Sequence, residues 1–179
     1  MKIYFIRHAE GYHNFCKDGW NIKFPKLTDL GIEQGKNLGD KLKNIKMDKI
    51  IVSPLSRTLH TAELVFGKQQ FQVLEHIREY IGNNCDLRES KVELQEKFPY
   101  ADFSLIEDKE GYNNIENDDV VDQRLEFFYK WLIKNNNYQT IAIVSHGGFL
   151  NRFFYKYSKQ LGINKIDWLD NCGVKVVNI

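Results

Sequence analysis

Five short apolar runs, most of them separated by longer helical patterns, constrain the fold of this chain more than any other feature. The runs are rich in β-branched and aromatic residues and cover residues 2–6, 49–53, 71–75, 140–145 and 174–178. Such strands, alternating with helices, are typical of a mostly parallel sheet that has helices on both faces. We therefore expect a three-layer αβα domain of the α/β class.

Four long helices are expected between or after these strands. Thr28 is a suitable N-cap for the first, and Ser53 followed by Pro54 has the pattern of an N-cap and first helical residue of the second. Apolar residues recur at helical spacing after the acidic pair at 118–119, which predicts the third. The fourth is expected directly after His146.

The length and charge of the chain indicate one domain that binds anions only locally. With 179 residues, of which 42% are hydrophobic, the chain can bury a sizeable core, and we expect a single domain over residues 1–179. The mostly polar segment 83–117 is interpreted as an excursion from the core on the substrate side. A formal net charge of +1 gives no general field that would attract nucleic acid or an anionic membrane.

The cysteines and the apolar runs bear on the cellular setting. Cys16, Cys85 and Cys172 are widely spaced, which fits neither a disulfide framework nor a zinc site and favours a reducing, cytoplasmic location. The apolar runs are too short to cross a bilayer, and the first expected strand begins directly after Met1, which leaves no room for a signal peptide. We expect a cytoplasmic protein without a membrane or nucleic-acid partner; its oligomeric state stays open.

Groups that favour anions fall at three expected strand ends. Arg7 and His8 follow the first strand, Arg57 lies in the first turn of the helix after the second, and His146 with Gly147 follows the run at 140–145. Ligands of open α/β sheets bind beyond the carboxyl ends of the strands. We therefore expect these side chains to meet at one edge of the sheet.

The residue types suit a phosphate ester. Arginine presents a planar fork that matches phosphate oxygens, and a histidine whose one ring N–H is held by a carbonyl keeps its other nitrogen nucleophilic. Either His8 or His146 could fill that role. Glu79 and Asp86 follow the run at 71–75, so a carboxylate can reach the same crevice.

Each residue taken alone also has a structural explanation. Arg57 could be a surface ion-pair partner, and a histidine at a strand end could be a hydrogen-bonded structural residue. The convergence of several such groups on one edge favours a binding site. The histidines interpreted as structural are His13, His60 and His76.

Patterns for several other chemistries do not occur in the sequence. It contains no HExxH or paired cysteines for zinc, no GxSxG, no Walker A pattern and no GxGxxG after a strand. We therefore expect neither a metal nor a nucleotide cofactor.

The motifs together resemble those of the histidine phosphatase superfamily, also called phosphoglycerate mutase-like. The family's RHG or RHA signature stands here as IRHAEGYHN, its second arginine motif as VSPLSRTLHTAEL, and its late histidine as VSHGGFL. The stretch LTDLGIEQGKNLGDKL is similar to the family's LTxxGxxQA, with Gly35 in place of alanine. The resemblance covers most of the chain and keeps the motif order.

The resemblance implies a role for each matched residue. His8 would be the nucleophile that becomes phosphohistidine. The residues implied around the phosphoryl group are Arg7, Arg57 and His146, and the implied substrate contacts are Asn14 and Gly147. The family fold is the phosphoglycerate mutase-like one, and the chemistry requires no metal or cofactor.

The proton donor is assigned from a more variable region. The stretch HIREYIGNNCDLRES resembles the branch in which a glutamate precedes a short loop and a CDxR segment, which implies Glu79. It would protonate the leaving alcohol and then activate the hydrolytic water. Glu10, Glu75 and Asp86 stay as alternatives.

The resemblance favours a phosphatase that acts on a small phosphorylated metabolite. Mutases of the family usually carry a longer insertion between the acid and the late histidine, and the segment after the first motif has no clear counterpart of their NRFxGW run. Phosphoglycerate mutase-type transfer is the main alternative. A non-catalytic phosphate-binding module on the same fold is a further one.

Overall fold

The computed structural model of the chain describes residues 1–109, 112–135 and 137–179. Within them a five-stranded sheet has the order β3-β2-β4-β1-β5. The strands are β1 (Lys2–Arg7), β2 (Lys49–Val52), β3 (Gln72–Val73), β4 (Thr140–Ser145) and β5 (Val174–Asn178). All neighbours pair in parallel except β5, which is antiparallel to β1. The expected mostly parallel sheet is confirmed.

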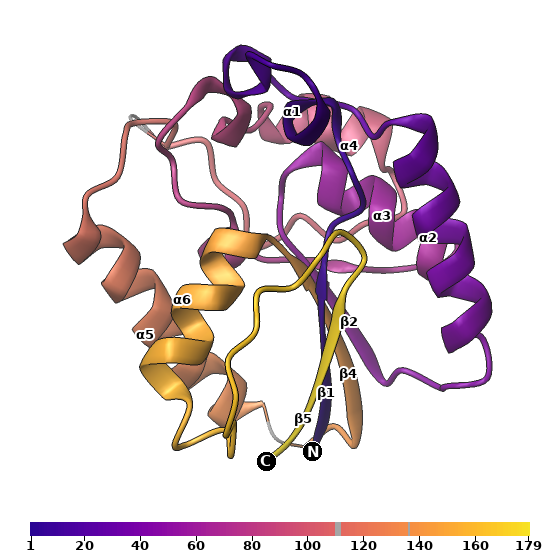
Figure 1. Ribbon diagram of the computed structural model, residues 1–179, viewed down its shortest axis with the longest axis vertical. Coiled ribbons are helices and arrows are strands. Elements are labelled where there is room, and N and C mark those ends of the chain that lie inside the picture. The colour runs from indigo at the N-terminus through magenta and orange to yellow at the C-terminus, as the bar shows by residue number, and fades with distance from the viewer. Residues whose placement is uncertain (110–111, 136) are drawn as a thin grey trace.

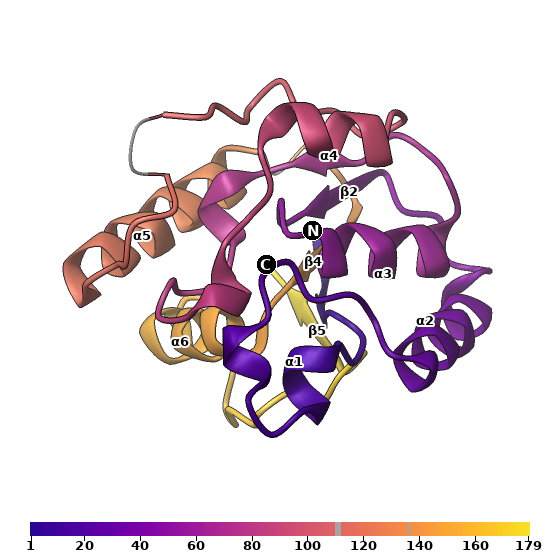
Figure 2. The same ribbon diagram turned by 90° about the horizontal axis from the view of Figure 1, so that it is seen from above.

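Helices cover both faces of this sheet (Figure 1). The α-helices are α1 (Tyr12–Phe15), α2 (Asp29–Leu42), α3 (Ser56–Phe66), α4 (Lys91–Lys97), α5 (Asp118–Lys134) and α6 (Gly147–Tyr157). Short 3₁₀ turns are η1 (Gly19–Asn21), η2 (Glu75–Ile77) and η3 (Asn84–Asp86). The view from above separates α5 and α6 on one side of the strands from α2 and α3 on the other (Figure 2). The expected three-layer αβα architecture is therefore confirmed.

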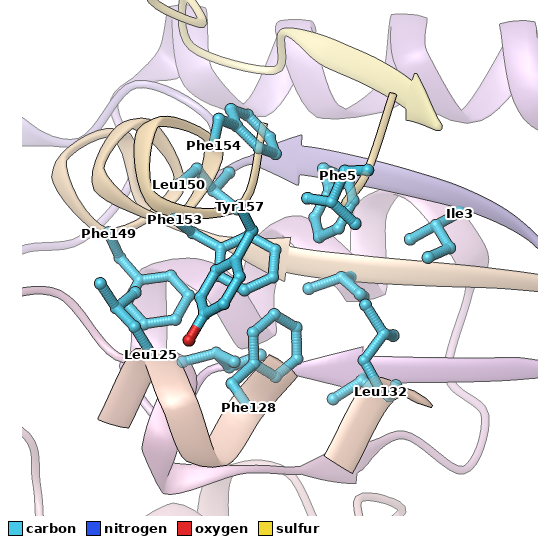
Figure 3. Close-up of a cluster of buried hydrophobic side chains, with 14 of the residues drawn as sticks. Ile3, Phe5, Leu125, Phe128, Leu132, Phe149, Leu150, Phe153, Phe154 and Tyr157 are labelled. Atoms are coloured by element: carbon cyan, nitrogen blue, oxygen red, sulfur yellow. The ribbon is translucent and has the colours of Figure 1, made fainter. Parts of the chain in front are cut away.

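Alternation along the strands divides the core into two halves. In β1, Ile3 and Phe5 belong to the cluster under α5 and α6, whereas Tyr4 and Ile6 belong to the cluster under α2 and α3. The first cluster is rich in aromatic rings from α5 and α6 (Figure 3). The β1 apolar side chains are buried on both faces, which explains why β1 reads as a continuous apolar run.

The structure confirms the expected N-terminus of α2 but not that of α3. Thr28 caps α2, because its Oγ1 accepts a hydrogen bond from the Gly31 N–H at 3.0 Å. The expected start at Ser53 and Pro54 is wrong, since α3 begins at Ser56. The Ser53 N–H still pairs with β4, and its hydroxyl lies 2.7 Å from His146 Nε2. Ser53 therefore continues the main-chain pairing with β4 just beyond β2, and its hydroxyl contacts a histidine instead of capping a helix.

The polar segment 83–117 contains η3 and α4, and its residues 110 and 111 lie outside the described part of the chain. The strand expected before it, over 71–75, is only the two-residue β3. No described helix is both long enough and apolar enough to cross a membrane.

Candidate active site

The ends of two adjacent strands bring both candidate histidines together. Arg7 ends β1 and is paired in register with Ser145, the last residue of β4. The residue that follows each strand is a histidine, and the ring centroids of His8 and His146 are 5.2 Å apart. The sequence-based expectation that these groups meet at one sheet edge is therefore met.

His8 is buried and held in one tautomer. Its Nδ1 lies 2.7 Å from the Ala9 carbonyl oxygen, so Nδ1 carries the proton and Nε2 keeps a free lone pair. The main chain directly after His8 is also held in place, because the Ala9 N–H donates to Thr61 Oγ1 at 3.0 Å. Burial first, and then the positive charge of Arg57, hold the pKa of His8 well below its usual value. The ring is therefore neutral and able to act as a nucleophile.

Arg57 is buried at the start of α3. Its Nη1 donates to the Cys85 carbonyl oxygen at 2.6 Å, and its Nη2 lies 3.7 Å from Asp86 Oδ1. Its Nε is buried and has no hydrogen-bond partner among the described residues. Because buried donors are nearly always satisfied, this orientation suits an anionic ligand.

Arg7 is held in a similar way at the end of β1. Its Nη1 donates to the Leu169 carbonyl oxygen at 2.9 Å, its guanidinium lies 5.4 Å from the centre of the Trp168 ring, and its Nε has no partner within the described part of the chain. A Cβ at Gly147 would lie 2.7 Å from the Trp168 ring and 3.2 Å from Arg7 Nε. Glycine at this position lets Arg7 and its aromatic neighbour approach α6.

His146 is fully buried and oriented by Ser53. Its Nε2 lies 2.7 Å from the Ser53 hydroxyl, whereas its Nδ1 has no hydrogen-bond partner in the described structure. Burial and the charge of Arg57 lower its pKa well below the usual value. When the Ser53 hydroxyl donates to Nε2, the Nδ1 atom carries the proton and can donate it to an anion.

Glu79 lies at the N-terminus of α6, where the helix dipole favours a carboxylate. Its oxygens accept hydrogen bonds from the N–H groups of Gly148 at 2.9 Å, Phe149 at 2.8 Å and Tyr80 at 3.0 Å. Burial raises the pKa of Glu79, while the Tyr80 and Gly148 N–H groups and the charge of Arg57 oppose this. Burial therefore favours the acid form of Glu79, whereas the N–H donors and the charge of Arg57 favour its carboxylate.

The three alternative carboxylates have hydrogen-bond or ion-pair partners of their own. Asp86 accepts hydrogen bonds from the Gly82 and Asn83 N–H groups, Glu75 pairs with Arg78 and Arg88, and Glu10 accepts the Thr28 hydroxyl. Asp86 still faces Arg57 directly. Among the four, Glu79 alone accepts hydrogen bonds from the helix that follows His146.

The segment after His8 adds two side chains. Asn14 accepts hydrogen bonds from the Gly11 N–H at 3.2 Å and from Asn171 Nδ2 at 3.3 Å, so its amide lies at the rim of the site. His13, interpreted from sequence as a loop residue, lies in α1 with its ring 5.3 Å from that of His8. Burial, followed by the charge of Arg57, lowers the pKa of His13 to about 3. The closeness of the two histidines in HAEGYH is the signal that could have indicated this.

A cavity of about 640 Å³ adjoins the site at Arg57. Its wall includes Lys23, Lys26, Lys97 and the ring of Phe98. This volume is in the range of small-molecule pockets. Among the described residues, no group of three or more histidines, cysteines or carboxylates is arranged to hold a metal ion.

The family model described as histidine phosphatase superfamily (branch 1) matches residues 3–179. The adenosylcobalamin/alpha-ribazole phosphatase of Escherichia coli is 30% identical over 167 residues, with 84% of this chain and 76% of that protein covered. A phosphoglycerate mutase-like protein of Arabidopsis thaliana is 29% identical over 204 residues, with 88% of this chain and 75% of that protein covered. Phosphoserine phosphatase 1 of Hydrogenobacter thermophilus is 28% identical over 149 residues, with 82% of this chain and 71% of that protein covered.

Solved structures share the fold along the whole chain. The crystal structure of a putative alpha-ribazole-5'-P phosphatase from Escherichia coli superposes with a TM-score of 0.73 at 26% identity, and covers 100% of this chain and 91% of that one. The alpha-ribazole phosphatase of Shigella flexneri gives a TM-score of 0.71 at 26% identity, with the same coverage.

Proposed function

Because the chain belongs to branch 1 of the histidine phosphatase superfamily, we propose that it is a single-domain phosphomonoesterase that works through phosphohistidine on His8. The observation that carries this proposal is the tautomer of His8. Its Nδ1 is held by the Ala9 carbonyl at 2.7 Å, which leaves Nε2 as the attacking atom. The charge on the phosphoryl group is balanced by arginines, so the reaction requires no metal.

In the first step, Arg7, Arg57 and His146 bind the phosphoryl oxygens and hold phosphorus in line with His8 Nε2. A bond forms between Nε2 and phosphorus as the bond to the leaving oxygen breaks. Glu79, protonated at this stage, donates its proton to that oxygen, and the free alcohol leaves.

In the second step, water attacks phosphorus from the side that the alcohol has left. The Glu79 carboxylate takes one proton from this water, and the bond between phosphorus and Nε2 breaks. Inorganic phosphate is released, and His8 returns to its neutral form. Glu79 is protonated again and ready for the next substrate.

Replacement of Arg57 by alanine should reduce kcat/KM by about 10²-fold or more, as expected when one preorganised group is removed from a transition-state charge. Phosphate release from p-nitrophenyl phosphate is the measurement. Arg152 is a matched control, because it is a partly exposed arginine that binds Asp118 and Asp122 on the surface. Arg152→Ala should retain wild-type activity. Full activity of Arg57→Ala would remove this residue from the proposed site.

We propose a small phosphorylated metabolite as the substrate. The relatives named for alpha-ribazole and phosphoserine phosphatase activity act on small monoesters, which supports this class. The cavity beside Arg57 offers space for such a molecule, and its wall carries lysines together with Glu63 and Glu89, which pair with Lys68 and Lys97. A screen of phosphorylated metabolites and phosphopeptides for phosphate release tests the proposal. Failure to hydrolyse any phosphate monoester would instead indicate a phosphate-binding module.

Mutase activity is the second candidate, favoured by the phosphoglycerate mutase-like relative. We expect the phosphatase outcome, in which phosphohistidine passes its phosphoryl group to water faster than to a bound sugar acid. Incubation with 3-phosphoglycerate, with and without 2,3-bisphosphoglycerate, should release inorganic phosphate without need of the bisphosphate. Rapid formation of the 2-phospho isomer that depends on the bisphosphate, with negligible phosphate release, would establish the mutase instead.

A further inference from the structure

Six charged side chains of alternating sign form a continuous chain next to the segment that carries Glu79. Contacts of 2.7 to 3.0 Å join neighbouring members of this chain. In order, the members are Arg124, Glu116, Arg78, Glu75, Arg88 and Asp108. Its first members, Arg124 and Glu116, are both buried, and neither belongs to one of the sequence motifs described above.

Arg124 of α5 binds the main chain on which Glu79 is carried. Its Nη1 donates to the carbonyl oxygens of Arg78 at 2.9 Å and His76 at 3.2 Å. Its Nη2 donates to the carbonyl oxygen of Glu79 itself at 3.3 Å and to Glu116 Oε2 at 2.8 Å. One guanidinium therefore holds three carbonyls of a four-residue stretch.

Glu116 holds the same stretch at its other end. The Ile81 N–H donates to Glu116 Oε2 at 3.1 Å, and the Glu116 N–H donates to the Ile81 carbonyl oxygen at 3.1 Å. Both main-chain groups of Ile81 are thus satisfied by one residue. The main chain of residues 76–81 is fixed from both ends by Arg124 and Glu116.

Arg124 also reaches the helix that receives the Glu79 carboxylate. Its guanidinium lies 5.7 Å from the centre of the Phe149 ring, and the Phe149 N–H is one of the donors to Glu79. The residue therefore contacts the segment that carries the carboxylate and a residue that binds it. A catalytic group displaced by about 1 Å can lose about 10²-fold in rate, so this double contact bears on proton transfer.

We propose that Arg124 and Glu116 are positioning residues for the proton donor: they fix the 76–81 main chain so that the Glu79 carboxylate meets the leaving oxygen. This inference rests on the proposed function, in which Glu79 protonates that oxygen. Buried ion pairs are often replaceable by apolar residues without loss of stability. Arg124 and Glu116 bind three main-chain carbonyl groups and one main-chain N–H group. Apolar side chains in their place could not form these hydrogen bonds.

The test compares two substrates that differ in their need for a proton. Arg124→Lys keeps the positive charge but loses the fork that spans the three carbonyls. It should reduce kcat on an alkyl phosphate by about 10-fold or more, and on an activated aryl phosphate by less than about 2-fold. Arg152→Lys is the matched control, because Arg152 of α6 forms ion pairs with Asp118 and Asp122 on the exposed side of α5, away from residues 76–81. It should leave both rates unchanged.

Glu116→Gln is the second variant. It tests the inference if thermal unfolding shows that Arg124→Lys is not folded. It removes the charge, retains a side-chain acceptor for the Ile81 N–H, and should give the same selective loss on the alkyl phosphate. Equal losses on both substrates, or no loss on either, would overturn the inference. Wild type and Glu79→Gln are measured alongside. A wild type that releases no phosphate contradicts the proposed function, whereas a selective loss in Glu79→Gln alone contradicts only the positioning role.

Discussion

Replacement of His8 by alanine should reduce turnover of every phosphate monoester by about 10⁴-fold or more, in the range observed when a catalytic nucleophile is removed. The reason is that the reaction depends on a bond between His8 Nε2 and phosphorus, and water cannot take that position in the first step. The ring of His8 is buried, and the rings of His146 and His13 lie 5.2 and 5.3 Å from it, so neither of them occupies its position. Steady-state phosphate release is the measurement.

A second substitution separates loss of chemistry from loss of fold. His8→Asn can keep an N–H near the Ala9 carbonyl, and it should be as inactive as His8→Ala while unfolding close to the wild-type temperature. The His8 hydrogen bond is local, so a large fall in thermal stability is not expected. Residual activity clearly above about 0.01% of wild type in either variant, the level that a 10⁴-fold loss leaves, would indicate that another group attacks phosphorus.

Replacement of Glu79 by glutamine should reduce kcat on alkyl phosphates by about 10² to 10⁴-fold, the range of general acid catalysis. An activated aryl phosphate leaves without a proton, so its loss should be much smaller. Glu79 Oε2 accepts from the Gly148 N–H and Oε1 from the Phe149 N–H, so the single amide oxygen of glutamine can keep only one of these two hydrogen bonds. Thermal unfolding of Glu79→Gln therefore has to accompany the rate measurement. Equal losses on both substrates would shift the acid role to one of the alternative carboxylates Asp86, Glu75 or Glu10.

The pH dependence gives an independent check on the same residue. Burial raises the pKa of Glu79, so its acid form persists to a higher pH than that of an exposed carboxyl group. For alkyl phosphates, kcat/KM should therefore fall as the pH rises through the pKa of Glu79, because the donor loses its proton. On the acid side, the lowered pKa of His8 keeps the nucleophile neutral below the pH at which an exposed histidine is protonated. In Glu79→Gln, the fall of kcat/KM at high pH should disappear, whereas the dependence of kcat/KM on pH at low pH should be unchanged.

The residues at the strand ends could be predicted because their positions follow from the alternation of strands and helices. The run at 140–145 stops directly before His146, and Arg7 alone separates the run at 2–6 from His8. The parallel pairing of β1 with β4 then places the two histidines side by side. Arg57 was predictable in the same way, as a residue in the first turn of the helix after β2. The roles of these residues stay predictions until they are measured.

The supporting residues could not be predicted, because their contacts join distant parts of the chain. Ser53 has the local pattern of a helix cap, yet its hydroxyl meets a histidine 93 positions away in the sequence. Arg124 appears as one of several charged residues in α5, and its carbonyl partners lie 45 to 48 positions earlier. Helical periodicity gives the face on which such a side chain lies and not what it binds. The cytoplasmic location expected from the cysteines also stays a prediction.

The most direct test of the phosphohistidine mechanism is a rapid quench of the wild-type protein during turnover of a ³²P-labelled monoester. We expect one phosphate per chain that is labile in acid and stable in base, that maps to His8, and that forms within the first turnover. The label should not form in His8→Ala. A phosphate bound to another residue, or turnover without any labelled protein at the earliest times, would contradict the covalent mechanism.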